Sequence, residues 1–121
     1  MLISTDNGKT VTRLPHKREF DYWRARISDE DYAAAVDAIN AYVDQREIFN
    51  ASWIPGSDWR ETAYQPIYVA CGENETQAGL FFGLIVFETL MNRQDKRWGF
   101  DRCEINGKDP GGMTYYELNN R

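Results

Sequence analysis

The sequence predicts an α+β fold, with a mainly antiparallel sheet and two helices on one face of it. Three observations support this prediction. Two segments carry helix caps followed by helical apolar spacing, and several short segments alternate apolar and polar residues, as half-buried strands do. The length of 121 residues is typical of a single domain with its own core. The predicted order is β-β-β-α-β-α-β-β over residues 1–121.

The N-terminal part predicts three short strands. Residues 2–14 have the pattern of a small hairpin, because Asn7-Gly8 tolerates the positive φ of a tight turn and β-branched residues flank it. Residues 19–27 follow Pro15 and predict a further extended stretch. There Phe20, Tyr22 and Arg24 alternate with Asp21, Trp23 and Ala25, which is the period of a strand.

The first helix is predicted to begin after Ser28 and to end near Gln45. The hydroxyl of Ser28 is a good N-cap, and the three acidic residues that follow suit the positive end of the helix dipole. An apolar stripe at helical spacing then consists of Tyr32, Val36, Ile39 and Val43.

The middle of the chain predicts a strand at residues 47–54 and a loop of about a dozen residues at 55–66. Residues 67–71 suit either a short extended piece or the approach to the next helix. Residues 97–105 and 113–118 predict a closing β-hairpin, because Trp98 and Phe100 alternate with Gly99 and Asp101 and the turn-rich segment 106–112 joins the two strands.

The second helix is predicted at residues 75–91, with Asn74 as its N-cap and Gln77 as the reciprocal capping partner. Its ten-residue apolar run, 78–87, is much shorter than the roughly 20 residues that span a bilayer. We therefore expect no membrane insertion.

A helix that is apolar all round must be covered on most of its faces. The first helix, the loop at 55–66 or a second copy of the protein could supply that cover. Glycines four residues apart flatten one side of the helix, although each costs about 1 kcal/mol relative to alanine. A homodimer interface is therefore predicted, and its candidate residues are Gly79, Phe82, Gly83, Val86, Trp98 and Phe100.

Composition and charge argue against several functions. The formal net charge of −5 disfavours binding to nucleic acid, which needs many cations facing phosphates. Residues 13–26 are locally basic and aromatic, and the solvent-facing side of a sheet edge explains this pattern better than a phosphate site. The N-terminal residues lack the pattern of a signal peptide, so a cytoplasmic protein is expected, with Cys71 and Cys103 as reduced core residues.

The sequence offers little catalytic chemistry. His16 is the single histidine, so a histidine-dependent triad or a histidine-rich metal site has almost no support within one chain. Glycine-rich phosphate-binding and dinucleotide motifs are absent from the sequence. We predict no catalytic residues, no metal and no cofactor.

One pocket is a candidate for a small-molecule ligand, between helix 75–91 and loop 56–64. Glu88 directly follows the apolar run. If Glu88 faces inward, it could act as a general acid or hold a cation. In the alternative, Glu88 points to solvent or pairs with an arginine such as Arg93 or Arg97. The loop would supply an aromatic, a bidentate donor and an acid, or else it is simply pinned on the core by its tryptophan. The candidate ligand-binding residues are Asp58, Trp59, Arg60, Tyr64 and Glu88.

Three segments resemble small uncharacterised bacterial proteins encoded in mobile gene cassettes, such as those of integrons. They are SWIPGSDW, QAGLFFGLIVFE and GGMTYYEL, spread over residues 48–118. The resemblance implies a compact bacterial domain and assigns no catalytic residue.

The sequence thus favours a non-enzymatic binding or interaction protein that self-associates through helix 75–91. The alternative is a small-molecule-binding module or enzyme that uses the pocket at loop 56–64. A third possibility is an inhibitor whose acidic surface occupies the site of a basic partner.

Overall fold

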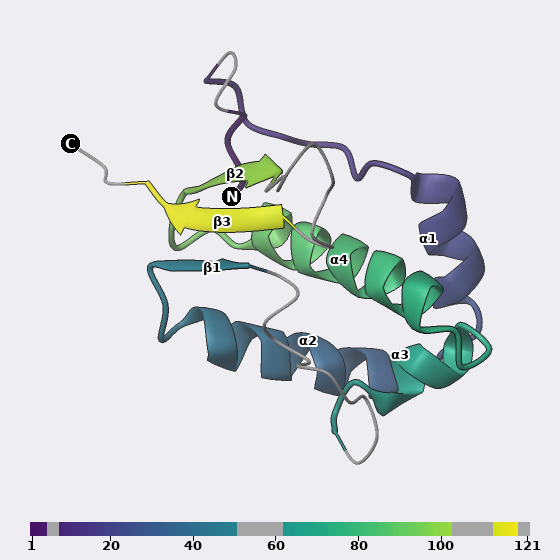
Figure 1. Cartoon of the computed structure of the whole chain (residues 1–121). Coiled ribbons are helices and arrows are strands. Elements are labelled where there is room, and N and C mark those ends of the chain that lie inside the picture. The colour runs from purple at the N-terminus through teal and green to yellow at the C-terminus, as the bar shows by residue number, and fades with distance from the viewer. Residues whose placement is uncertain (5–7, 51–61, 103–112, 119–121) are drawn as a thin grey trace, which may run out of the picture.

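The computed structural model describes residues 1–4, 8–50, 62–102 and 113–118 (Figure 1). These residues form four α-helices and a three-stranded antiparallel sheet, which confirms the α+β class. The helices are α1 (Lys17–Arg24), α2 (Asp29–Val43), α3 (Gln65–Ala70) and α4 (Glu75–Asn92). The strands are β1 (Ile48–Asn50), β2 (Trp98–Arg102) and β3 (Met113–Glu117).

Helix α4 is the central element, and its predicted position is confirmed to within one residue. The side chain of Asn74 accepts a hydrogen bond from the backbone N–H of Gln77 at 3.0 Å, as the capping pattern predicts. Its buried residues are Ala78, Phe81, Phe82, Ile85, Val86, Phe87, Thr89 and Leu90. Among the described residues, no helix is long and apolar enough to cross a membrane.

Helix α2 also begins where the sequence predicts. The Ser28 hydroxyl accepts a hydrogen bond from the Asp31 backbone N–H at 3.1 Å, which satisfies one of the free donors of the first turn. The helix buries Ala35, Ile39 and Val43, and it lies alongside α4 (Figure 1).

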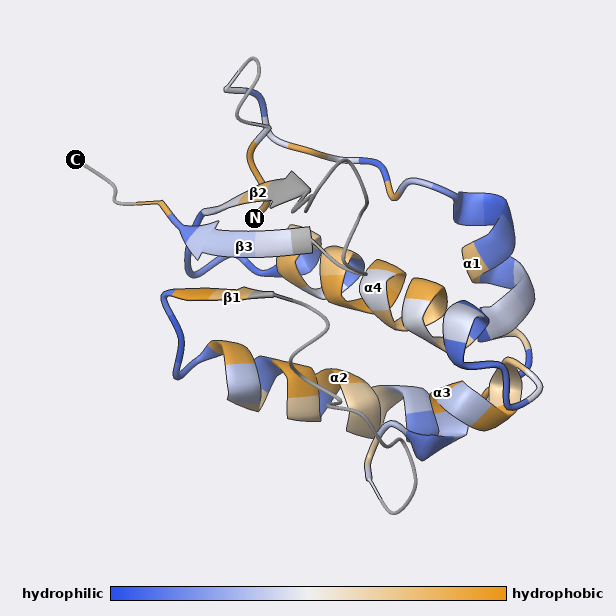
Figure 2. Ribbon diagram, in the orientation of Figure 1, coloured by the Kyte–Doolittle hydropathy of each residue, from blue (hydrophilic) through white to orange (hydrophobic). Residues whose placement is uncertain are grey.

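The extended stretch predicted at residues 19–27 is wrong, because most of it is helix α1. Phe20 and Trp23 are buried and Ile27 is buried further along, so the apolar positions follow helical spacing of three and four residues. Tyr22 is 62% exposed, and the alternation of Phe20 with Tyr22 therefore did not mark one face of a strand. Figure 2 shows α1 as mostly hydrophilic, in contrast to α4.

The segment that follows the loop is helix α3 rather than a strand. Pro66 lies in its first turn, where the missing N–H of proline has no intrahelical partner to lose. Ile67 and Ala70 are buried three residues apart. Gly72 then adopts a φ of +67°, a conformation that favours glycine, and it connects α3 to α4.

The sheet has the strand order β1-β3-β2, so the C-terminal strand lies in the middle. The predicted closing hairpin is confirmed in its strands, with Phe100 opposite Tyr115. Phe49 is opposite Tyr115 on the other side. The predicted N-terminal hairpin is a small one: Ile3 bridges Thr10, and Leu2 forms a parallel bridge with Trp98. Residues 51–54 and 103–105 of the predicted strands lie outside the described residues, as does Asn7.

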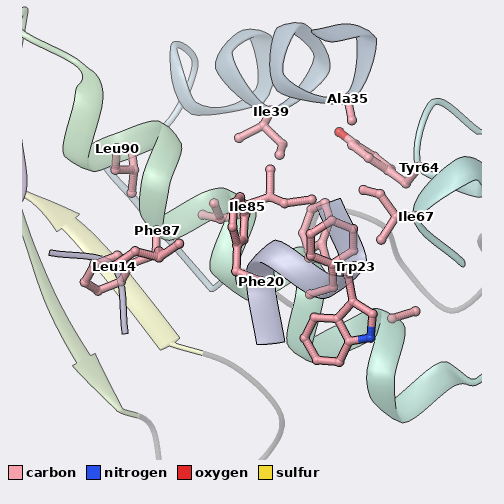
Figure 3. Packing of buried hydrophobic residues seen from close by; sticks show 14 of the residues in the cluster. Leu14, Phe20, Trp23, Ala35, Ile39, Tyr64, Ile67, Ile85, Phe87 and Leu90 are labelled. Carbon is pink, nitrogen blue, oxygen red and sulfur yellow. The ribbon is translucent and has the colours of Figure 1, made fainter. Parts of the chain in front are cut away.

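The hydrophobic core lies between the helices and one face of the sheet. Phe49 contacts Tyr42 of α2 with ring centroids 5.9 Å apart, and Phe100 contacts Phe87 of α4 at 5.4 Å. Both predicted helices therefore pack on the same face. At the other end of α4, side chains of α1, α2 and α3 converge on the helix (Figure 3).

The opposite face of the sheet has a close contact between Gly99 and Tyr116. A Cβ atom at Gly99 would clash with Cε2 of the Tyr116 ring, so the ring would have to move away. We expect Gly99→Ala to lower the free energy of unfolding by about 1 kcal/mol or somewhat more. Chemical denaturation of Gly99→Ala, of Tyr116→Ala and of the double variant tests this contact. Once Tyr116 is alanine, Gly99→Ala should lower the free energy of unfolding very little. If the losses of the two single variants simply add up in the double variant, the contact is contradicted.

Candidate functional site

Two features of α4 are candidates for function, and the first is the carboxylate of Glu88. Glu88 is half-buried on the side of α4 that faces α2. The hydroxyl of Tyr32 donates a hydrogen bond to Oε1 of Glu88 at 2.9 Å. Burial, together with the nearby charge of Glu88, raises the pKa of Tyr32 well above its ordinary value, so this hydroxyl keeps its proton.

Arg24 at the end of α1 holds the ring of Tyr32. Its guanidinium carbon lies 4.1 Å from the ring centroid, in a cation–π contact. The same side chain donates to the Ile27 carbonyl at 3.2 Å and to the Asp29 carboxylate at 2.6 Å. Tyr32 is thus fixed on both sides, and its hydroxyl is held towards Glu88.

Arg93, directly after α4, forms a second polar cluster on the same side. It is 13% exposed and donates to Asn40 at 3.0 Å, to Asp44 at 2.5 Å and to Asp95 at 2.7 Å. The charged hydrogen bond from Arg93 lowers the pKa of Asp95 to about 2. The predicted alternative in which Glu88 pairs with Arg93 is wrong, because Arg93 binds these two aspartates instead.

A groove of about 290 Å³ lies between α2 and α4 and joins the two clusters. Its lining residues are Tyr32, Val36, Asn40, Glu88, Thr89, Asn92 and Arg93. We call it the α2–α4 groove.

The predicted pocket at loop 56–64 differs from this groove. Tyr64 is buried and packs edge-on against Phe82 with ring centroids 5.1 Å apart, so it belongs to the core. It does not line the groove that contains Glu88. Asp58, Trp59 and Arg60 lie outside the described residues.

The predicted interface residues divide into two groups. Phe82, Val86 and Trp98 are at most 2% exposed, so their side chains are core residues that a second copy could not reach. Phe100 is half-buried and packs against Phe87. The covering of α4 by α1, α2 and α3 buries Phe82 and Val86, and Trp98 of β2 packs against Phe49.

Gly79 and Gly83 are different, and they define the second candidate feature. A Cβ atom at either glycine would meet no described atom within 4 Å. Leu80 between them is 58% exposed, and Leu84 is half-buried. These four residues, which we call the open side of α4, lie on one side of the helix and carry no charge.

Residues with the usual catalytic chemistry are not gathered in the described structure. His16 is exposed at the start of α1, whereas Cys71 is buried after α3, and burial raises the pKa of its thiol to about 11. No group of three or more His, Cys, Asp or Glu residues that could hold a metal occurs in the described ranges. Cys103 lies outside them.

The basic stretch at 13–26 is largely occupied by contacts within the chain. Lys17 pairs with Asp21 at 2.6 Å, and Arg26 donates to the hydroxyl of Tyr22 at 3.0 Å. Arg24 binds Asp29, as described above.

A scan of protein-family models and searches of curated proteins and solved structures found no match to this chain. The resemblance to mobile-gene-cassette proteins therefore stays a prediction.

Sequence reasoning missed Tyr32, Arg93 and Leu80 as site residues. The signal for Leu80 was present, because it is a large apolar residue between two glycines on a helix. Tyr32 was assigned to the apolar stripe of α2, and no local pattern indicated that its hydroxyl meets a carboxylate 56 residues later.

Proposed function

We propose that the protein works by binding rather than by catalysis, and that it pairs with a second copy through the open side of α4. The observation that carries this proposal is the exposure of Leu80 between two glycines at which an added Cβ atom would meet no described atom within 4 Å. Glycine in a helix costs about 1 kcal/mol relative to alanine, and no described contact within the chain requires it at either position. Close approach of another helix would give both glycines a role.

The chemistry of this surface suits a second copy of the protein. Two copies of the net charge of −5 repel each other, and an uncharged side of a helix is where such chains can approach. Leu80 would then be removed from water against the flat surface of the two partner glycines.

Placement in the cytoplasm is part of the same proposal. The described cysteine, Cys71, is a free and buried thiol, which a reducing compartment preserves. The negative net charge supports a protein partner over a nucleic acid.

Replacing Leu80 by lysine tests the proposal. We expect Leu80→Lys to abolish self-association without unfolding the chain, because a charge would enter the centre of the interface while the side chain remains in water in the single chain. Sedimentation velocity over a range of concentrations measures the association, and circular dichroism checks the fold.

Val69→Lys provides the matched control. Val69 is 53% exposed on α3, so this variant introduces the same charge at an exposed apolar residue on another helix. It should associate as the wild type does. Equal loss in both variants would show that charge alone opposes association, and unchanged association of Leu80→Lys would refute the role of α4.

A further inference from the structure

The charges around the α2–α4 groove are unbalanced. Arg24 is paired with Asp29, and Arg93 is shared between Asp44 and Asp95, so both cations are already compensated. Glu88 accepts a hydrogen bond from Tyr32, and no described lysine or arginine forms an ion pair with it. The groove therefore has an excess of negative charge, with Glu88 as its half-buried focus.

The shape and lining of the groove add to this. Tyr32 engages one carboxylate oxygen of Glu88, and a carboxylate can accept several hydrogen bonds in all. Val36 supplies an apolar wall, and Asn40 and Asn92 supply amide groups. At about 290 Å³, the volume is just below the range of drug-sized pockets and suits a small ligand.

We propose that the α2–α4 groove binds the ammonium group of a small aliphatic amine, with Glu88 as its counter-ion. An ammonium group has three donors and no acceptor, so it complements a carboxylate whose other partner is a hydroxyl donor. The aliphatic chain would lie along Val36. Tyr32 is a positioning residue, since its hydrogen bond fixes the orientation of the carboxylate.

Other ligand classes fit the groove less well. An anion would meet the charge of Glu88, and the guanidinium of Arg93 is already bound by two aspartates. A divalent metal needs several oxygen ligands, whereas Glu88 is the single carboxylate among the lining residues.

The first test compares n-butylamine, which is an ammonium ion at neutral pH, with the neutral n-butanol. Each is titrated into the full-length, isotopically labelled protein at constant ionic strength, and amide chemical shifts are followed by NMR. We expect saturable shifts with the amine that cluster on α2 near Tyr32 and on α4 near Glu88, and none with the alcohol. Equal shifts with both compounds, or amine shifts scattered over the acidic surface, would overturn the proposal.

The second test removes the charge but keeps the hydrogen bond. Glu88→Gln preserves size and an acceptor for Tyr32, and it should weaken amine binding by about tenfold or more. The control Asp37→Asn removes the same charge from the exposed part of α2 and should leave the affinity within about twofold. Equal weakening in both variants would show that only net charge matters. The comparison of amine with alcohol needs no variant, so it decides the proposal even if Glu88→Gln does not fold.

This groove and the open side of α4 are neighbours that share no residue. Leu84 lies one turn before Glu88, but none of the four residues of the open side lines the groove. Amine binding is expected in the single chain and in the pair, so failure of one proposal leaves the other standing.

Discussion

Replacing Phe81 by alanine is expected to lower the free energy of unfolding by about 3–5 kcal/mol, the range for large aromatic side chains removed from cores. Phe81 is fully buried in α4. Its ring centroid lies 5.7 Å from that of Phe20 and 5.6 Å from that of Trp23, so it joins α1 to α4. The shortened side chain would leave a cavity that the rings of α1 cannot fill without moving. Urea denaturation followed by circular dichroism measures the loss.

The neighbouring residue supplies the control. Leu80→Ala removes a side chain that is 58% exposed, and it should change the stability of the single chain by no more than about 0.5 kcal/mol. The comparison belongs at low protein concentration, where self-association contributes least to stability. Equal losses in the two variants would contradict the packing of α1 on α4.

Replacing Arg93 by methionine is expected to lower the free energy of unfolding by about 2 kcal/mol. The guanidinium connects the end of α4 to Asn40 of α2 and to Asp44 directly after α2, and methionine keeps much of the length of the side chain but none of its donors. The loss is smaller than a sum over the hydrogen bonds, because Asp44 and Asp95 are more than half exposed and water screens their charges. Arg18→Met, at an exposed residue of α1, is the control and should have little effect.

The ion pair of Arg93 with Asp95 also makes the free energy of unfolding depend on pH. The pKa of Asp95 falls from 3.8 to about 2 in the folded chain, so the unfolded chain binds this proton more strongly. The stabilisation by Asp95 is therefore complete above about pH 4, and it is lost as the pH falls towards about 2. Denaturation at several pH values should show a weaker decline over this interval in Arg93→Met than in the wild type. An identical decline would mean that Arg93 does not lower this pKa.

The sequence predicted the elements whose ends carry local chemical signals. Ser28 and Asn74 cap α2 and α4 by hydrogen bonds within three residues, so a local pattern was enough to find them. The alternation within β2 likewise placed Trp98 and Phe100 on one side of the strand, where Trp98 is fully buried and Phe100 packs against Tyr115.

Short helices were harder, because over six to eight residues the two periodicities resemble each other. In α1, Phe20 and Trp23 already indicated helical spacing, yet Tyr22 completed an apparent alternation. Only the packing of Phe20 and Trp23 on Phe81 separates the two interpretations, and that contact joins residues about 60 positions apart.

The candidate site is likewise built from contacts between residues that are far apart in the sequence. Glu88 was identified from its place after the apolar run, but its partner Tyr32 depends on how α2 lies against α4. Contacts between elements also decide which of the predicted interface residues are buried. The helices α1 and α3 bury Phe82 and its neighbours, and they leave Gly79, Leu80 and Gly83 uncovered.

Native mass spectrometry of the unmodified protein tests the central claim most directly, because it counts subunits without a label or a variant. The proposed function predicts a species of two 14.1 kDa chains whose fraction rises with protein concentration. A single chain at every concentration at which the protein stays dissolved would contradict self-association through the open side of α4.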